Sequence, residues 1–236
     1  TFKNGVTITQ SELNVGTGVT MTNEKGSLIK AADTNIDGIV NNEGKFASGY
    51  TINVNTTGVL NNGNSTDGYN PDYTAIGADI DNSGIVNNYS VINQNSSVTN
   101  NAGATLNNKS TGHIGADIDN SGIIVNEGEI NKHSDLVNLA GGTITNQGNG
   151  TIHHFTNNDT DGTKDAGVIT SYAGGILSAS VNNGDLNLDA GDGSAAQSTL
   201  NAAITGSGTT NITSGDVTLG TTLTQGAINV LTGGKL

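Results

Sequence analysis

The sequence has 236 residues, a net charge of −13 and a composition dominated by 35 Asn, 35 Gly and 32 Thr. These three residue types disfavour helix interiors, so the composition excludes a helical fold. The 8 basic residues are all Lys, and without guanidinium groups this acidic chain is unsuited to nucleic acid or to anionic membranes. It has no Cys for disulfides or thiolate metal sites, and no apolar run long enough to span a membrane. Because it starts at Thr1 and not at a methionine, we expect a processed or excised piece.

A short unit recurs along much of the chain. It consists of a Gly, two mostly β-branched residues and an Asn four positions after the Gly. The copies begin at Gly38, Gly58, Gly84, Gly122 and Gly142. A longer phrase, IGADIDNSGIVNNYSVIN at 76–93, returns as IGADIDNSGIIVNEGEIN at 114–131, an offset of 38 residues. Such internal periodicity is typical of repeat architectures.

The Asn residues of these units follow one another at intervals of 18 to 26 residues, so the 38-residue repeat corresponds to two turns of about 19–20 residues. We expect them at the corners of the turns, as Asn42, Asn62, Asn88, Asn108, Asn126 and Asn146. A single turn cannot bury its own apolar side, so turns must stack, and the pattern predicts an all-β parallel β-helix. Asn suits a corner because it tolerates the left-handed backbone conformation and because stacked carboxamides form ladders.

After residue 181 the composition shifts from Asn and Gly towards Ala, Ser and Thr, but aliphatic residues still alternate. Alternation with a period of two indicates strands with one buried face. We therefore predict one β-solenoid over 1–236, with Asn/Gly-rich turns at 1–181 and Ala/Ser/Thr-rich turns at 182–236. Three segments break the period, and they are predicted to be loop insertions near 64–75, 156–167 and 189–199.

The turn length, the phrases GGTITNQGNGTI and AGGILSASVNNGDL and the absence of Cys resemble the β-helix passengers of bacterial autotransporter and filamentous-haemagglutinin-like exoproteins. The resemblance covers nearly the whole chain. It implies a right-handed parallel β-helix that is extracellular, at the bacterial cell surface, and that serves adhesion, cell-cell contact or biofilm formation. The implied partner is a glycan or a protein on a neighbouring cell or host surface.

Two groups of residues are candidates for binding. Acidic side chains at alternate positions imitate the first half of a calcium loop, although the bidentate Glu of a helix-loop-helix site is missing. These calcium candidates are Asp159, Asp161, Asp165, Asp79, Asp81, Asp117 and Asp119. The 64–75 insertion concentrates aromatic and polar side chains that suit sugar or protein recognition. Its candidate recognition residues are Tyr69, Pro71, Asp72 and Tyr73.

Catalytic constellations are poorly supported. Glycoside hydrolysis needs two carboxylates about 5–9.5 Å apart across a groove, whereas the pairs at Asp79 and Asp117 are expected two turns apart. His153 and His154 are adjacent and would face opposite sides of a strand, so they cannot ligate one metal together. We therefore expect no enzymatic activity and no cofactor other than calcium, with a polysaccharide-acting β-helix enzyme as a remote alternative.

A second hypothesis treats the chain as a self-assembling subunit of a filament or surface layer. Strand pattern continues close to both termini, from GVTITQ to INVLTGGKL, without an evident polar cap. Uncapped solenoid ends expose unpaired strand edges that template another chain. In this hypothesis the partners are copies of the protein itself, joined end to end by β-strand pairing.

Overall fold

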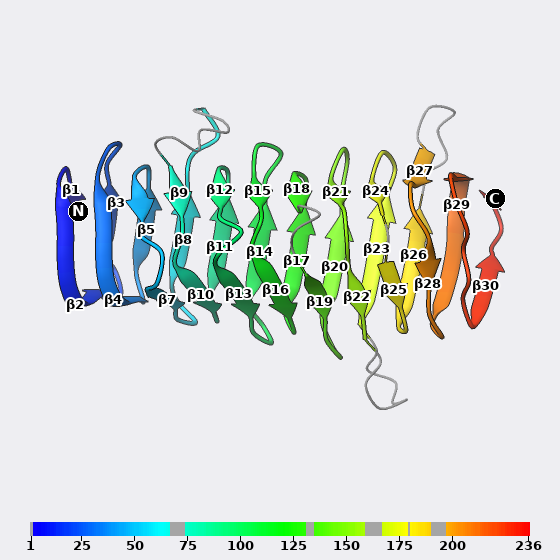
Figure 1. Ribbon diagram of the computed structural model, residues 1–236, viewed down its shortest axis with the longest axis horizontal. Helices are drawn as coiled ribbons and strands as arrows, with labels where there is room; N and C mark the ends of the chain where they lie inside the picture. The colour runs from blue at the N-terminus through cyan, green and yellow to red at the C-terminus, as the bar shows by residue number, and fades with distance from the viewer. Residues whose placement is uncertain (1, 67–73, 131–134, 159–166, 179, 190–196) are drawn as a thin grey trace.

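The computed structural model describes residues 2–66, 74–130, 135–158, 167–178, 180–189 and 197–236. Every regular element among them is a β-strand, and every strand pairing is parallel. The chain forms an elongated rod along which successive turns lie side by side, with the two termini at opposite ends (Figure 1). The prediction of an all-β parallel β-solenoid is confirmed, while the right-handed sense of the coil stays a prediction.

Each turn places one strand on each of three faces. The first face consists of β1 (Phe2–Asn4), β3 (Thr20–Asn23), β5 (Ile39–Asn42), β8 (Val59–Asn62), β11 (Ile85–Asn88), β14 (Thr105–Asn108), β17 (Ile123–Asn126), β20 (Thr143–Asn146), β23 (Val168–Tyr172), β26 (Asp185–Asp189), the start of β29 (Thr209–Leu219) and β30 (Ala227–Val230).

The second face consists of the start of β2 (Thr7–Val15), the start of β4 (Leu28–Ile36), β6 (Lys45–Phe46), β9 (Ala75–Ile76), β12 (Val91–Ile92), β15 (His113–Ile114), β18 (Glu129–Ile130), β21 (Thr151–Ile152), β24 (Ile176–Leu177), β27 (Gln197–Leu200), the end of β29 and β31 (Gly234–Lys235).

The third face consists of the ends of β2 and β4, then β7 (Thr51–Val54), β10 (Asp79–Asn82), β13 (Ser97–Asn100), β16 (Asp117–Asn120), β19 (Leu136–Asn138), β22 (Thr156–Asn157), β25 (Ser180–Asn182) and β28 (Ile204–Thr205). The described strands make ten complete turns, from β1–β2 to β26–β27–β28, before β29, β30 and β31. Pairing continues without interruption from β25 to β28 and from β26 to β29, across the change in composition.

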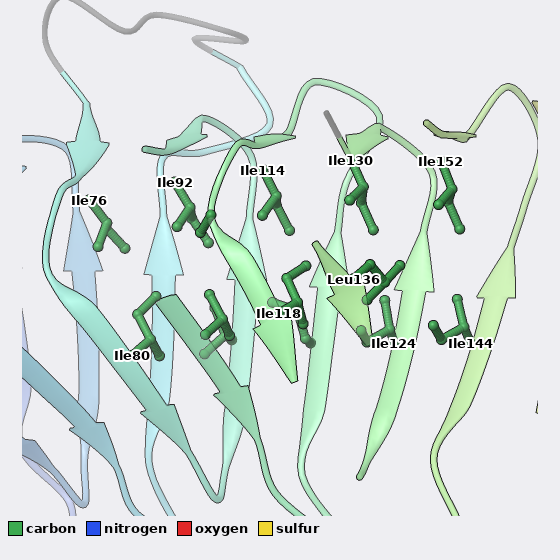
Figure 2. Packing of buried hydrophobic residues seen from close by; sticks show 14 of the residues in the cluster. Ile76, Ile80, Ile92, Ile114, Ile118, Ile124, Ile130, Leu136, Ile144 and Ile152 are labelled. Atoms are coloured by element: carbon green, nitrogen blue, oxygen red, sulfur yellow. The ribbon is translucent and has the colours of Figure 1, made fainter. Parts of the chain in front are cut away.

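Columns of aliphatic side chains fill the interior, because alternate residues of a strand point to the same side. On the second face one column runs through five successive isoleucines, and each is fully buried. Figure 2 shows this column as Ile76, Ile92, Ile114, Ile130 and Ile152. Burying each of these side chains contributes about 1.5–3 kcal/mol relative to leaving it exposed.

Two internal ladders of Asn side chains accompany the aliphatic columns. In the first ladder each Nδ2 donates to the Oδ1 of the Asn one turn further along, over 2.7–2.8 Å. Its members are Asn23, Asn42, Asn62, Asn88, Asn108, Asn126 and Asn146. All six predicted corner residues therefore lie in one hydrogen-bonded file, and every member is fully buried.

The second ladder was not anticipated from the sequence. Its Nδ2···Oδ1 distances are 2.7–2.9 Å, and its members are Asn82, Asn100, Asn120, Asn138, Asn157 and Asn182. The second amide proton of many members goes to a main-chain carbonyl, as from Asn82 to Thr105 O over 3.1 Å. Both protons of such a buried amide are thereby satisfied, which avoids the cost of about 1–3 kcal/mol for an unpaired polar group.

One reason given for Asn at the corners is wrong. Among the described residues, only glycines have positive φ, so Asn does not supply the left-handed conformation. Glycine is also needed where turns approach closely. A Cβ at Gly84 would lie 2.3 Å from Asn55 O and 2.4 Å from Gly58 O, which leaves no room for any side chain.

The predicted loop boundaries overlap strands. Ala75 opens β9, Thr156 and Asn157 form β22, and Asp189 closes β26. The segment 189–199 also includes the first residues of β27. Strand pairing between turns thus extends further into these segments than local composition indicates, because the neighbouring turn supplies the hydrogen-bond partners.

Candidate functional site

The acidic candidates on the third face point outward, away from the core. Asp79 and Asp81 flank the buried Ile80 on β10, and Asp117 and Asp119 occupy the same positions on β16. The strand β13 pairs with both β10 and β16 and therefore separates the two acidic pairs. Two strand spacings place the pairs about 9.6 Å apart, beyond the separation that a retaining sugar hydrolase uses.

These carboxylates accept hydrogen bonds from the next turn. Asp79 Oδ1 accepts from the backbone N of Ser97 over 2.8 Å, and Asp117 Oδ1 accepts from the backbone N of Asp135 over 3.0 Å. Among the described residues, no three His, Asp or Glu side chains converge as a metal site would require. The remaining calcium candidates, Asp159, Asp161 and Asp165, lie outside the described residues.

The histidines join carboxylates on neighbouring turns. His113 Nδ1 lies 3.1 Å from Glu129 Oε2, and His153 Nε2 lies 3.2 Å from Glu129 Oε1. His154 is directed elsewhere, with Nδ1 3.5 Å from Asp135 Oδ1. Since all these side chains are about a third exposed or more, each pair contributes only about 0–1 kcal/mol. The cluster is a surface network, and His153 and His154 do indeed face different partners.

The predicted recognition residues Tyr69, Pro71, Asp72 and Tyr73 lie outside the described residues. The described start of that insertion, however, borders a polar groove with a cavity of about 310 Å³. We call it the Tyr89 groove, and its lining residues are Thr22, Asn41, Glu43, Asn61, Gly63, Asn64, Ser65 and Tyr89. Sequence reasoning did not identify this groove.

The groove exists because one side chain is missing from a column at the corner between the first and second faces. The residue that follows the first ladder's Asn is Glu43 on one turn, Gly63 on the next and Tyr89 on the turn after that. Glycine therefore leaves a gap between a carboxylate and a phenol ring. Gly63 has φ of +80°, which strains any other residue, and its Cβ position lies only 3.1 Å from Ser90 Cβ and 3.4 Å from Tyr89 Cβ.

Main-chain hydrogen bonds fix the positions of the three residues. The backbone N of Glu43, Gly63 and Tyr89 each donates over 2.8 Å to the backbone carbonyl of a ladder residue on the preceding turn. The acceptors are Asn23, Asn42 and Asn62. The buried ladder thus holds the surface groove in a preorganised geometry, which lowers the entropic cost of binding.

Several polar groups in the groove have no protein partner within the described part of the chain. They are the Glu43 carboxylate, the Tyr89 hydroxyl, the Thr22 and Ser65 hydroxyls and the Nδ2 group of Asn41. Asn41 is the last member of an outer ladder of Asn side chains. In this ladder the Nδ2 group of each Asn donates over 2.8 Å to the Oδ1 of the Asn one turn nearer the N-terminus, in the order Asn107, Asn87, Asn61 and Asn41. The free donor end of this chain of amides therefore opens into the groove.

The sequence carried a signal for this arrangement. The unit reads NNEG at 41–44, NNGN at 61–64 and NNYS at 87–90, so the residue after the paired Asn changes from Glu to Gly to Tyr. The signal was hidden because the insertion after Gly63 lengthens the spacing to the next unit.

No protein-family model matches the chain, and no curated protein matches it. Among solved structures, the chain is similar to a fragment described as the TibC-catalyzed hyper-glycosylated TibA55-350 fragment, at 15% sequence identity and a TM-score of 0.34. The match covers 97% of this chain and 93% of that one. At this level of likeness no argument about family or function follows. The described part of the chain holds no helix with the length and apolar character to cross a lipid bilayer.

Proposed function

We propose that this protein is a non-enzymatic bacterial surface adhesin that works as a rigid extracellular rod. The observation that carries the proposal is the Tyr89 groove, where a preorganised set of unpaired polar groups lies beside the 64–75 insertion. Unpaired polar groups around an aromatic ring in a rigid concave site favour ligand binding. The acidic composition without Arg supports a partner other than nucleic acid.

Display on a non-adherent bacterium tests the proposal. Cells that carry the chain should attach to other cells or to a glycan- or protein-coated surface, whereas cells with the display system alone should not. Deletion of 67–73 should keep the fold, because β8 and β9 lie outside the deletion and the five residues left at the corner are one more than the four at 109–112 between β14 and β15. Attachment equal to that of the empty display system would contradict the adhesin function.

The acidic pairs lie about 9.6 Å apart by strand spacing, beyond the range of retaining sugar hydrolases and at the upper limit of the range of inverting ones, and we propose that the protein does not cleave glycans. The control is a reducing-end assay with purified protein and soluble polysaccharides. We expect no new reducing ends, and the Asp81→Asn, Asp119→Asn double variant should behave like the wild type. Turnover that is lost in the double variant would establish the remote alternative, a polysaccharide-acting enzyme.

A self-assembling subunit is the second candidate function. Ile228 and Val230 occupy inward positions of β30, in pairing with Thr210 and Ile212, but they are 41% and 51% exposed. A further turn would cover these side chains, whether it came from another copy or from more of the same polypeptide. Electron microscopy should show fibres or sheets if copies join here, and Val230→Asp should abolish them. Separate rods for both proteins would exclude this assembly.

A further inference from the structure

We propose that the Tyr89 groove is a binding site for a neutral carbohydrate. This inference rests on the proposed adhesin function and gives its ligand a chemical class. The site consists of described residues alone, with Glu43 and Tyr89 as its two walls and Gly63 as its floor. Its cavity of about 310 Å³ is at the lower end of the range for small-molecule sites, about 300–1,000 Å³.

The two walls complement the two kinds of surface on a sugar ring. A pyranose has an apolar face of C–H groups, which packs against an aromatic ring, and a rim of hydroxyls. Tyr89 supplies the ring, and Glu43 lies two turns away, about 9.6 Å by strand spacing. Gly63 lies between them and adds no side chain to the groove.

The free polar groups complement hydroxyls in particular. A hydroxyl both donates and accepts, so it pairs equally with a carboxylate, an amide NH₂ or another hydroxyl. The groove offers the Glu43 carboxylate as acceptor, the Asn41 Nδ2 group as donor, and the hydroxyls of Tyr89, Thr22 and Ser65 as either. The chain of amides that ends at Asn41 polarises its terminal donor and strengthens the bond it makes.

The charge of the groove selects neutral sugars. Glu43 is the charged residue among those that line the groove, and the lining includes no lysine. An acidic sugar would therefore place its carboxylate or sulfate near Glu43 without a cation among the lining residues. We expect like-charge repulsion to exclude uronic and sialic acids.

A peptide ligand fits the groove less well. The strands beneath it, β3, β5, β8 and β11, are paired with one another in continuous register, so they offer no free strand edge for a peptide to extend. Apart from the Tyr89 ring, the lining side chains are polar or small, which gives no pocket for an apolar anchor.

A second cavity on the surface is similar in size but lacks the aromatic ring of the Tyr89 groove. It has a volume of about 380 Å³ and is lined by Ser48, Gly77, Val91, Ile92, Asn93, Gln94, Asn95, His113 and Gly115. It offers amides but no Tyr, Phe or Trp ring, so it lacks the surface on which a sugar ring stacks. We place the site at Tyr89 for that reason.

The experiment uses the purified full chain and isothermal titration with lactose, maltose, cellobiose and N-acetyl-lactosamine as neutral probes, and with sialyllactose and digalacturonate as acidic ones. We expect binding of at least one neutral probe and of neither acidic probe. Tyr89→Ala should weaken that binding by about tenfold, and Glu43→Gln should weaken it several-fold. Each variant is first checked by circular dichroism for an unchanged melting curve.

Tyr172→Ala is the matched control. Tyr172 occupies the position of Tyr89 on the same corner, four turns further along, and it does not line the groove. Its loss should leave sugar binding unchanged. No binding of any neutral probe, unchanged binding by Tyr89→Ala, equal loss in Tyr172→Ala, or preference for an acidic probe would each overturn the inference.

Attachment assays with the displayed protein distinguish a failure of the carbohydrate site from a failure of the adhesin function. Attachment that persists in Tyr89→Ala, together with no sugar binding by the purified chain, would reject the carbohydrate site and retain the adhesin. Sugar binding that requires Tyr89, without attachment of the displayed chain to any surface, would retain the site and reject the adhesin.

Discussion

Asn108 donates a hydrogen bond from Nδ2 to Oδ1 of Asn126 over 2.8 Å, and both side chains are fully buried. Asn108 in turn accepts from Asn88 Nδ2 over 2.8 Å. Each internal carboxamide is therefore a donor on one side and an acceptor on the other. The repeat uses an amide here because neither a carboxylate nor an aliphatic side chain can do both.

This relationship predicts a large effect of Asn108→Asp. The new carboxylate would be buried against the Asn126 oxygen, and an uncompensated buried charge costs about 3–5 kcal/mol. Asn107→Asp is the control, because Asn107 lies on the outer side of the same strand and is half-buried. Urea unfolding near neutral pH should show the loss for Asn108→Asp and a change below about 1 kcal/mol for Asn107→Asp.

The same substitution predicts a pH dependence. Burial raises the pKa of the introduced carboxyl above its unfolded value of about 3.9. The penalty is therefore complete above the raised pKa and disappears as the pH falls below about 3.9, where both states are protonated. The stability difference from wild type should narrow on acidification, and a difference that is independent of pH would contradict the ladder geometry.

Ile124 and Ile123 provide a test of the aliphatic core. The two are neighbours on β17, but Ile124 is fully buried whereas Ile123 is 45% exposed. We expect Ile124→Ala to lower the free energy of unfolding by about 2–5 kcal/mol and Ile123→Ala to change it by less than about 0.5 kcal/mol. Equal losses in thermal or urea unfolding would mean that the inward and outward faces of β17 are assigned incorrectly.

Gly84→Ala should disturb the turn packing. The added Cβ meets two main-chain oxygens at 2.3 and 2.4 Å, so the backbone of neighbouring turns must move, at a cost of about 1–3 kcal/mol. Gly16→Ala is the matched control, because no atom lies within 4 Å of its Cβ position and its φ is not positive. We expect Gly16→Ala to be neutral or slightly stabilising by unfolding measurements.

Of the predicted calcium candidates, we expect Asp159, Asp161 and Asp165 to bind the ion and the aspartates of the third face not to bind it. Asp79 and Asp117 lie on alternate turns, and each already accepts a backbone hydrogen bond. Calorimetric titration should give a heat of calcium binding. This heat should persist in the double variant Asp79→Asn, Asp117→Asn and be lost in the double variant Asp159→Asn, Asp161→Asn. A titration without heat, together with a melting temperature that calcium does not change, would show that the protein does not bind calcium.

Local pattern was sufficient to predict which side of many strands faces inward. The sequence places Ile80 between two Asp residues, and the structure buries Ile80 while both Asp residues are exposed. Spacing likewise predicted the file that includes Asn42 and Asn108, because side chains of one strand alternate and turns have nearly constant length. The direction of a side chain depends only on its neighbours in the strand, and the Asn file depends on the nearly constant length of the turns.

Contacts between turns required the tertiary structure. Three features join residues that are 16 to 26 positions apart: the second Asn ladder, the pairing of Glu129 with two histidines and the gap at Gly63. Insertions and corners of unequal length shift the spacing, so sequence distance does not tell which side chains stack.

The sequence by itself therefore determined the repeating β architecture and the inward or outward direction of its side chains, because these follow from alternation along each strand. Only the tertiary structure decided which other residues meet across turns, and with them the second Asn ladder and the groove between Glu43 and Tyr89. The physical reason is that inter-turn register is set by the main-chain hydrogen bonds of the whole stack, such as Gly63 N to Asn42 O, and each turn takes its register from the one before it.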